Sequence, residues 1–196
     1  MLKNKRTPGN DGLTAGLYKC HWKLLEPYFM ACLDESITQG ELSHSQKQGI
    51  VRLIEKKDKD RREIENWRPI SLLNIDTKIF SKILANRIKN VLPEIISEEQ
   101  TGFIKQRFIG EGIQLINGVL DYCKENNEQG LMIAIDFKKA FDSVNHKFLF
   151  KALEQFGFGE NFIHMVRTLH CNAENAVLNN GFTTKYFKLE RSCRQG

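Results

Sequence analysis

An acidic residue directly after a short apolar run is the part of this sequence best placed to do chemistry. Residues 131–135 read Leu-Met-Ile-Ala-Ile, Asp136 follows them, and Phe141 and Asp142 come five and six positions later. A run this short and rich in isoleucine favours a fully buried strand. That strand would present the Asp136 carboxylate at its carboxyl edge, facing a cleft. Aspartate also opens turns, so a purely structural role at a strand end is the ordinary alternative.

Basic residues occur where they can serve the same chemistry. Lys138 and Lys139 flank Asp136, and a polar stretch between two apolar runs carries six more: Lys56, Lys57, Lys59, Arg61, Arg62 and Arg68. The formal charge of +5 is compatible with a polyanionic partner but is common in proteins that bind none. Bases near an acid indicate phosphates near a metal, although residues 56–62 by themselves also fit a solvated hairpin tip.

The composition is that of a soluble globular protein. The 196 residues are 41% hydrophobic and 27% charged, enough for one large domain or two small lobes, and no run of about 18 apolar residues predicts a membrane span. The five cysteines are scattered and never form a C-x-x-C pair, which indicates reduced thiols rather than a zinc site. No secretory signal follows the basic N-terminus, so we expect the protein to stay inside the cell.

The N-terminal half predicts helices around one hairpin. Turn formers at residues 7–12 precede a helical pattern, which Pro27 is expected to divide and Gly40 to end. Two short runs rich in β-formers, Gly49–Glu55 and Arg68–Leu73, flank the basic stretch and predict a β-hairpin.

Helices dominate the predictions that follow. Asp76 is expected to cap a helix with an apolar stripe that Pro93 stops. A polar loop then leads into a packing helix, marked by Ile113, Ile116, Val119 and Leu120 at helical spacing.

The C-terminal third alternates helix and strand patterns. Asp142 or Ser143 is expected to cap a helix that Gly157 ends, and residues 160–170 predict another. The residues Asn-Asn-Gly at 179–181 lie between β-rich runs and predict a hairpin turn. Mixed helices and hairpins around one buried strand indicate an α+β fold.

Five motifs in order resemble those of reverse transcriptases. They are P-G-N-D-G-L-T-A at residues 8–15, W-R-P-I-S-L-L-N at 67–74, Q-x-G-F with a later arginine at 100–107, A-I-D-F-K-K-A-F-D-S-V at 134–144, and R-Q-G at 194–196. The sequence is most similar to the polymerases of non-LTR (LINE-type) retrotransposons, and group II intron enzymes are more distant relatives. The resemblance covers nearly the whole chain, and it implies a location in the cytoplasm, the nucleus or both.

The resemblance implies a right-hand polymerase fold of the α+β class. Residues 1–128 would form helical fingers with a β-hairpin and the helices that join fingers to palm. Residues 129–196 would form the amino-terminal part of the palm, an antiparallel sheet. The thumb and the rest of the palm would be absent from these residues.

The same resemblance implies two-metal nucleotidyl transfer, in which one Mg²⁺ activates the primer hydroxyl and the other holds the incoming triphosphate. Asp136 matches the first catalytic aspartate of the family, and the backbone carbonyl of Phe137 would add a second oxygen ligand. Phe141 matches the aromatic gate that excludes a 2′-hydroxyl, which favours a DNA-making enzyme; an ordinary core position is the alternative. Asp142 is interpreted mainly as a helix cap.

The other implied site residues bind phosphate or nucleic acid. Lys56 and Arg68 match the fingers residues that clasp the β- and γ-phosphates of the nucleotide. Gln195 would contact the nucleotide and the templating pair, while Arg107 and Arg194 would touch the template or primer backbone.

The sequence also departs from the family pattern. Glu55 stands where proline is usual, and Gln106 and Ser192 stand where glycine is usual or frequent. The family's next motif has two adjacent aspartates, and no such pair occurs in these residues. We therefore expect a fragment that does not polymerise alone, from a parent enzyme that uses two Mg²⁺ ions, an RNA template, a DNA primer or RNA–DNA hybrid, and dNTPs.

Two other readings remain open from the sequence. One is a non-catalytic, retroelement-derived nucleic-acid-binding module, for which salt-sensitive RNA binding is expected. The other is a degenerate fragment without a partner.

Overall fold

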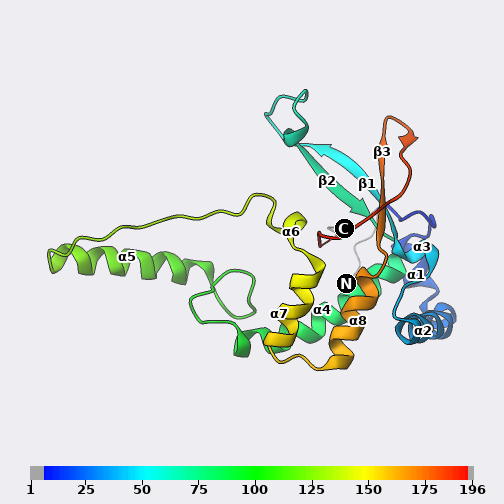
Figure 1. The fold of residues 1–196 in the computed structure, drawn as a ribbon, viewed down its shortest axis with the longest axis horizontal. Coiled ribbons are helices and arrows are strands. Elements are labelled where there is room, and N and C mark those ends of the chain that lie inside the picture. The colour runs from blue at the N-terminus through cyan, green and yellow to red at the C-terminus, as the bar shows by residue number, and fades with distance from the viewer. Residues whose placement is uncertain (1–6, 194–196) are drawn as a thin grey trace. The chain divides into compact units, whose positions relative to one another are not determined.

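The computed structural model of the protein describes residues 7–193, which fall into two compact units. The first unit combines the described residues up to Lys82 with those from Lys139 onward, and the second is Ile83–Lys138. Figure 1 shows that the first unit combines one sheet with helices that gather toward one end of its strands. The mixed α+β class predicted from the sequence is confirmed.

The sheet of the first unit is built on the predicted hairpin. Strands β1 (Gln48–Glu55) and β2 (Trp67–Leu72) pair antiparallel, as predicted. β1 also pairs in parallel with β3 (Glu174–Asn179), so β1 lies between β2 and β3 in the sheet. The sheet is therefore mixed. Its parallel pair joins β3 to a strand of residues 1–128, whereas within residues 129–196 β3 pairs antiparallel with the short strands that follow it, as expected. β3 returns beside β1 after a long helical excursion, which allows the parallel direction.

The third strand opens the second hairpin, also as predicted. β3 turns into β4 (Phe182–Thr183) through Asn180 and Gly181, whose φ angles are 48° and 82°. Two consecutive positive φ values match a type I′ turn, which suits the twist of a two-residue hairpin. A short fifth strand, β5 (Phe187–Lys188), pairs with the start of β3.

The N-terminal helices pack on the start of helix α4 (Ile75–Ile95). Helices α1 (Ala15–Cys20), α2 (Trp22–Gln39) and α3 (His44–Lys47) precede the sheet. The chain breaks at His21, and Pro27 lies inside α2, so the predicted division at Pro27 is wrong. Proline removes one backbone hydrogen bond, and apolar packing on both sides of it, including the Trp22–Phe29 ring contact, keeps the helix intact. Gly40 ends α2 at a φ of 71°, as predicted.

One small apolar cluster joins these helices. Ala15, Tyr18 and Ile75 are buried together, with Trp22 and Leu25 among the side chains packed against them. Burial raises the pKa of Tyr18 to about 12, and the nearby carboxylates of Asp76 and Asp11 act in the same direction. The Tyr18 phenol therefore stays neutral at physiological pH and belongs to the core.

Three helices link the segment at residue 139 to β3. They are α6 (Ala140–Ser143), α7 (His146–Gln155) and α8 (Glu160–His170), and α8 has the predicted bounds. The Asn145 side chain caps α7 by accepting from the backbone N–H of Lys147 at 2.9 Å, so the predicted cap at Asp142 or Ser143 is wrong. Those two residues lie within α6, and only Asn145 directly precedes the longer helix.

One arginine of α8 contacts two side chains of α7. Arg167 donates to Glu154 at 3.0 Å, and its guanidinium lies 4.7 Å from the centre of the Phe150 ring. His164 joins α8 to α2, with its Nε2 2.7 Å from the Ile37 carbonyl oxygen. Gly157, with a φ of 77°, follows α7 as predicted.

Helix α4 (Ile75–Ile95) runs from the first unit into the second. It begins at Ile75, with the Asn74 carbonyl accepting from Lys78 N–H at 3.1 Å, so Asp76 is not its cap. The Asp76 carboxylate instead accepts from Gln46 Nε2 at 2.7 Å. Pro93 lies inside the last turn and does not stop the helix at once, because it costs only one backbone hydrogen bond there.

The second unit leaves much apolar surface uncovered. Helix α5 (Ile109–Glu125) forms where the spacing predicted, yet its Ile113 and Val119 side chains are exposed, so the predicted packing is not observed. Residues 131–135 are irregular and exposed, with Leu131 at 87%, so the predicted buried strand is wrong. An apolar run becomes a strand only when its backbone pairs, and no strand within residues 7–193 pairs with it. None of the helices in this range has the length and apolarity to cross a membrane.

Candidate nucleotide and nucleic-acid site

The hairpin register places two predicted phosphate ligands on one face. Ile54 pairs with Arg68, and the backbone N–H of Lys56 donates to the Asn66 carbonyl at 2.8 Å, which continues the ladder by two residues. Lys56 and Arg68 are therefore diagonal neighbours on the same face, a relation that typically separates side chains by roughly 7–8 Å. This spacing suits two cations that hold adjacent phosphates of one triphosphate.

The two side chains differ in how they are engaged. The Arg68 residue is exposed, and its side chain forms no hydrogen bond or ion pair with any other residue in the described range 7–193. The Lys56 ammonium is half-buried and donates to the Glu65 carbonyl at 2.7 Å. An unengaged guanidinium can take a phosphate in bidentate geometry, and a backbone-anchored ammonium adds charge from a fixed position.

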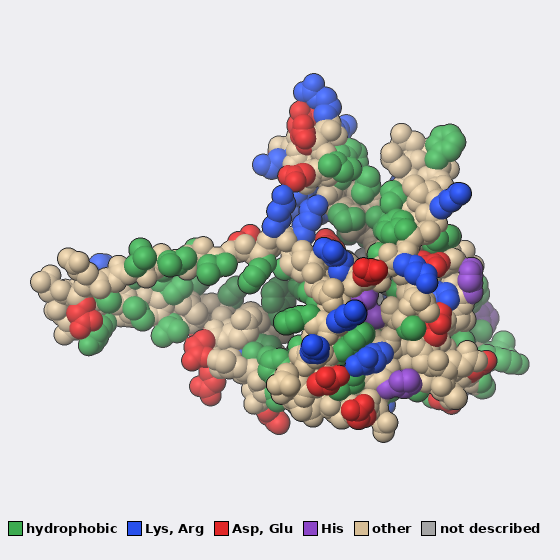
Figure 2. All heavy atoms as spheres, in the orientation of Figure 1, with side chains coloured by type: hydrophobic (Ala, Val, Ile, Leu, Met, Phe, Trp, Pro, Cys, Tyr) green, Lys and Arg blue, Asp and Glu red, His purple; other side chains and the backbone are tan. Residues whose placement is uncertain are grey.

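The tip of the β1–β2 hairpin, beyond Lys56 and Arg68, contains acidic side chains that pair with its basic ones. Figure 2 shows Lys and Arg side chains gathered at the tip of the β1–β2 hairpin, with acidic groups among them. Arg61 pairs with Glu55 at 2.6 Å, and Arg62 pairs with Asp60 at 3.1 Å, which lowers the pKa of Asp60. The tip therefore has the features of a solvated turn. Glu55, at the position where the family pattern has proline, supplies one of these ion pairs.

The predicted sugar gate lies against the segment that leads to R-Q-G. The Phe141 carbonyl accepts from Cys193 N–H at 2.9 Å, and the Val144 carbonyl accepts from Ser192 N–H at 2.9 Å. The Phe141 side chain is 57% exposed, so it is not the core residue of the alternative reading. Arg194 and Gln195 lie outside the described residues and directly follow Cys193.

A buried histidine, His146, joins the start of α7 to residues 190–192, and the sequence did not reveal this role. His146 Nε2 lies 3.0 Å from the Ser192 carbonyl oxygen, and its ring centre is 4.7 Å from that of His170. The backbone N–H of His146 also donates to the Glu190 carbonyl at 3.3 Å. These partners lie more than 20 residues away along the chain, so no local sequence signal identified His146.

The predicted metal ligands lie in the second unit. Asp136 and Phe137 belong to the irregular, exposed segment that follows residue 130. Within the described part of the chain, no group of three or more His, Cys, Asp or Glu residues is placed to hold a metal ion. The metal-binding role of Asp136 and Phe137 therefore stays a prediction.

A comparison with protein families decides the identity of the chain. The model of the family described as reverse transcriptase (RNA-dependent DNA polymerase) matches residues 54–196. The chain belongs to the reverse transcriptase family. The match includes the hairpin strand β2, the Asp136 motif and the R-Q-G motif, which agrees with the resemblance predicted from the sequence.

Relatives of this reverse transcriptase chain are proteins of non-LTR retrotransposons. An uncharacterized 149 kDa protein of transposon TX1 from Xenopus laevis is 34% identical over 196 residues, which is 100% of this chain and 15% of the relative. A putative 115 kDa protein of the type-1 element R1DM from Drosophila melanogaster is 26% identical over 196 residues, again 100% of this chain and 19% of the relative. A probable RNA-directed DNA polymerase from transposon X-element of the same fly is 26% identical over 145 residues, covering 73% and 16% of the two chains. The chain thus spans less than a fifth of each of these relatives.

Arg107 of the reverse transcriptase Q-x-G-F motif has a structural role in this chain. Its terminal nitrogens donate to four backbone carbonyls, those of Pro93, Ile96, Ser97 and Gln100, at 2.5–3.0 Å. Carbonyls at the end of a helix lack intrahelical partners, so the guanidinium both closes α4 and fixes the loop after it. A contact of Arg107 with template or primer stays a prediction.

Both glycine departures from the reverse transcriptase pattern lie at left-handed backbone positions. Gln106 has a φ of 69° and Ser192 a φ of 89°. Residues other than glycine pay for this conformation, roughly 1 kcal/mol each. Both positions therefore have a backbone conformation that glycine would adopt at lower cost.

Restoring glycine in the loop is expected to stabilise the protein. Gln106→Gly should raise the free energy of unfolding by about 0.5–1 kcal/mol, because relief of the left-handed strain exceeds the added entropy of the unfolded chain. Thermal unfolding followed by circular dichroism measures it. The same exchange at Gln114, inside α5, should lower stability by up to about 1 kcal/mol. Equal destabilisation by both variants would contradict the strain at Gln106.

Proposed function

We propose that these residues form the nucleotide-binding fingers and part of the palm of an enzyme that copies RNA into DNA. The observation that carries the proposal is the shared face of Lys56 and Arg68 on the β1–β2 hairpin, in a chain of the reverse transcriptase family. We retain residues 1–128 as fingers with the helices that join them to the palm, and 129–196 as palm. The RNA template, the primer and the dNTP belong to this proposal.

Arg68 and Lys56 would contribute to catalysis by positioning the triphosphate and by stabilising its negative charge. Arg68 and Lys56 would hold the β- and γ-phosphates of the incoming dNTP, which neutralises charge on the leaving pyrophosphate. Phe141 would lie beneath the sugar and exclude a 2′-hydroxyl. Its backbone bond to Cys193 supports this role, because that bond ties the gate to the segment that leads to the nucleotide contact Gln195.

The oxygen donors near Asp136 fit a hard divalent cation. A carboxylate and a backbone carbonyl are ligands that Mg²⁺ accepts, and the exposed segment leaves both accessible. When bound, Mg²⁺ would supply charge stabilisation and activate the primer hydroxyl. No two adjacent aspartates occur in residues 1–196, so we propose that these residues do not polymerise alone.

Joining the chain to a segment with the aromatic-Ala-Asp-Asp motif and a thumb tests the proposed function. The joined protein should incorporate dNTPs on an RNA template, and Arg68→Ala should raise the KM for dNTP roughly 10- to 100-fold, because one charge-assisted phosphate contact is lost. Arg62→Ala, which removes a tip charge already paired with Asp60, is the matched control and should change KM less than twofold.

Three results would count against the proposal. An unchanged KM in Arg68→Ala would refute the clasp. Templated incorporation by residues 1–196 alone would refute their inactivity. RNA binding without synthesis by the folded, joined protein would favour the non-catalytic binding module instead.

A further inference from the structure

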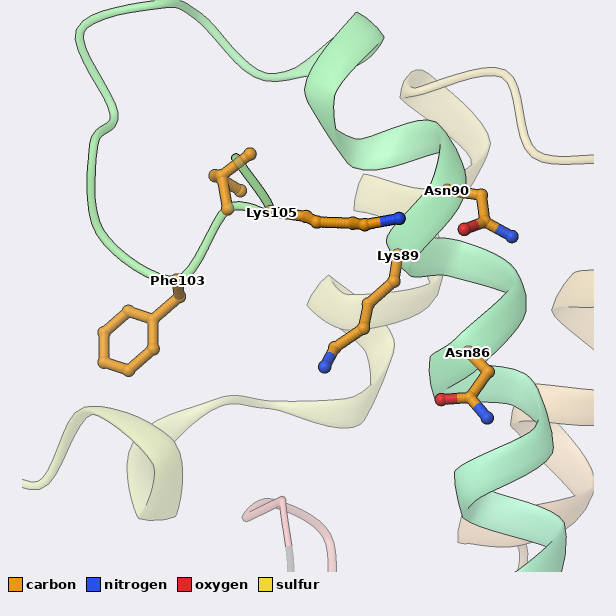
Figure 3. Close-up of a pocket in the computed structure, with 6 residues that line it drawn as sticks. Asn86, Lys89, Asn90, Phe103 and Lys105 are labelled. Atoms are coloured by element: carbon orange, nitrogen blue, oxygen red, sulfur yellow. The ribbon is translucent and has the colours of Figure 1, made fainter. Parts of the chain in front are cut away.

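Two exposed surfaces of the second unit differ in chemistry. One is a pocket of about 660 Å³ beside the second half of α4, and most of the side chains that line it are polar: Asn86, Lys89, Asn90 and Lys105 (Figure 3). Its two lysines do not suit an apolar partner. The other surface is apolar and consists of helix α5 and the run 131–135, which residues 7–193 leave uncovered.

The run 131–135 has the pattern of a strand with one apolar face. In an extended backbone Leu131, Ile133 and Ile135 point to the same side, and they are 87%, 71% and 78% exposed. Among residues 7–193, none forms a hydrogen bond with a backbone group of this run. An apolar run with unpaired backbone groups is a template for pairing with a strand of another chain.

Helix α5 presents an apolar stripe beside the start of this run. The members of the stripe are three and four residues apart on one face, and all are exposed: Ile109, Ile113, Ile116 and Leu120. Cys123 continues the stripe, and its carbonyl accepts from Glu128 N–H at 2.8 Å. A Cβ atom at Gly130 would lie 3.8 Å from Cys123 Sγ, so the run begins on the striped side of α5. Figure 1 shows the chain leaving the end of α5 and returning in the opposite direction.

We propose that two copies of this chain associate through residues 131–135. The two runs pair antiparallel with Ile133 on the two-fold axis, so Leu131 of one copy faces Ile135 of the other. A two-stranded ribbon is marginal alone in water and becomes stable when a helix covers its apolar face. The α5 stripe of each copy supplies that cover. Because the pairing is two-fold, it closes at a dimer.

Charges at the ends of the run favour this arrangement. Glu128 and Lys138 are exposed and lie five residues before and after Ile133. In the antiparallel register Glu128 of each copy faces Lys138 of the other, which gives two pairs of opposite charge. A parallel, in-register pairing would place each of these charges opposite its like, which destabilises a strand pair. The charge pattern is therefore complementary to a second copy in the antiparallel direction.

The apolar area is sufficient for a dimer. The exposed apolar side chains of the run and the stripe are Ile109, Ile113, Ile116, Leu120, Leu131, Met132, Ile133 and Ile135. A large apolar side chain has roughly 100 Å² of apolar surface, so two copies would bury on the order of 1,000 Å² in total. A specific interface between proteins needs about this area.

Sedimentation equilibrium of the 196-residue chain tests the association. Over about a hundredfold range of concentration, the mass should rise from 22.7 kDa toward twice that value. Ile133→Lys should weaken dimerisation by about a hundredfold or more, because it places two like charges opposite each other in an apolar interface. Phe182→Lys adds the same charge at an exposed apolar residue of β4 and should stay within about twofold of wild type.

Exchanging the end charges tests the register. Glu128→Lys and Lys138→Glu each place like charges opposite each other at both ends of the ribbon, and each should weaken dimerisation by about fivefold or more at low salt. The double variant Glu128→Lys/Lys138→Glu restores two pairs of opposite charge. It should return to within about twofold of the wild-type affinity.

A disulfide tests the position of the two-fold axis. Facing residues of an antiparallel pair have Cα atoms roughly 4.5–5.5 Å apart, within the range that a disulfide spans. Ile133→Cys should therefore form a covalent dimer on mild oxidation, seen on a non-reducing gel above the wild-type background of native thiols. Leu131→Cys is the matched control, since its two copies would lie roughly 13 Å apart along the ribbon and should give no excess over wild type.

Four results would overturn the proposal. They are a monomer at every concentration, assemblies that grow beyond the dimer, equal dimerisation by Ile133→Lys and Phe182→Lys, and a double charge variant no tighter than its single variants. Circular dichroism establishes that each variant is folded. These measurements use neither nucleic acid nor dNTP, so their outcome is independent of the proposed function.

Discussion

Asp136→Asn is expected to lower templated DNA synthesis by about a thousandfold or more in the chain joined to an Asp-Asp segment and thumb. Asparagine has nearly the shape of aspartate but no charge, so the metal would lose an anionic ligand. Metal-ion stabilisation of a transferring phosphoryl group is worth several kcal/mol, and each 1.4 kcal/mol changes a rate tenfold. Single-turnover incorporation of one dNTP measures the loss directly.

The exposed location of Asp136 allows a loss of catalysis to be distinguished from a loss of folding stability. Its side chain is exposed on an irregular segment, so the neutral replacement leaves no buried group unsatisfied. We therefore expect unchanged thermal stability and RNA affinity, and a loss of synthesis alone. Asp142→Asn is the matched control, because Asp142 is a nearby carboxylate that is not assigned to the metal and accepts a long 3.4 Å bond from Ser192 Oγ, and it should keep synthesis within about tenfold. Activity of Asp136→Asn above a tenth of wild type would refute the ligand assignment.

Features that depend on neighbouring residues were predictable from the sequence. The β1–β2 hairpin follows from two short β-rich runs around a polar stretch, and the turn at Asn180 and Gly181 follows from residues that tolerate positive φ. The shared face of Lys56 and Arg68 is a consequence of that hairpin's register. The resemblance to the family indicated Lys56 and Arg68 as phosphate ligands, and the strand register shows that they are neighbours.

Features that depend on distant partners were not predictable. Residues 131–135 have the composition of a buried strand, but composition cannot supply the strand that must pair with them. The parallel pairing of β1 with β3 and the bond from His146 to the Ser192 carbonyl both join segments far apart along the chain. Pro27 and Pro93 were expected to break helices, and tertiary packing outweighed this local preference.

The second large predicted effect is a loss of folding stability from a substitution in the N-terminal turn at residues 8–12. Gly9→Ala is expected to lower the free energy of unfolding by about 3 kcal/mol. A Cβ atom at Gly9 would lie 2.1 Å from Asn74 Oδ1, 2.4 Å from Asn74 N and 2.6 Å from the Leu73 carbonyl carbon. Two of these atoms are backbone at the start of α4, so a side-chain rotation cannot relieve the overlap.

The Asn74 side chain cannot move away from the new methyl group, because it is buried and hydrogen-bonded on its other side. It is 1% exposed, and its amide nitrogen donates to the Ser45 carbonyl at 3.1 Å. The chain can relieve the clash only by moving the Gly9 turn away, which also breaks the 3.3 Å bond from Asn10 to Gln48 at the start of β1. The expected cost is therefore that of detaching this turn from the sheet and from α4.

A second glycine in the same unit separates this clash from the general effect of adding a methyl group. Gly16 lies in α1, and its nearest neighbour to a new Cβ is Thr14 Oγ1 at 3.7 Å, an ordinary contact. Gly16→Ala should therefore raise stability by up to about 1 kcal/mol through helix propensity. Urea unfolding of both variants gives the comparison. If Gly9→Ala were as stable as wild type, the P-G-N-D-G turn would not be packed against Leu73 and Asn74, and the first family motif would have no structural role in these residues.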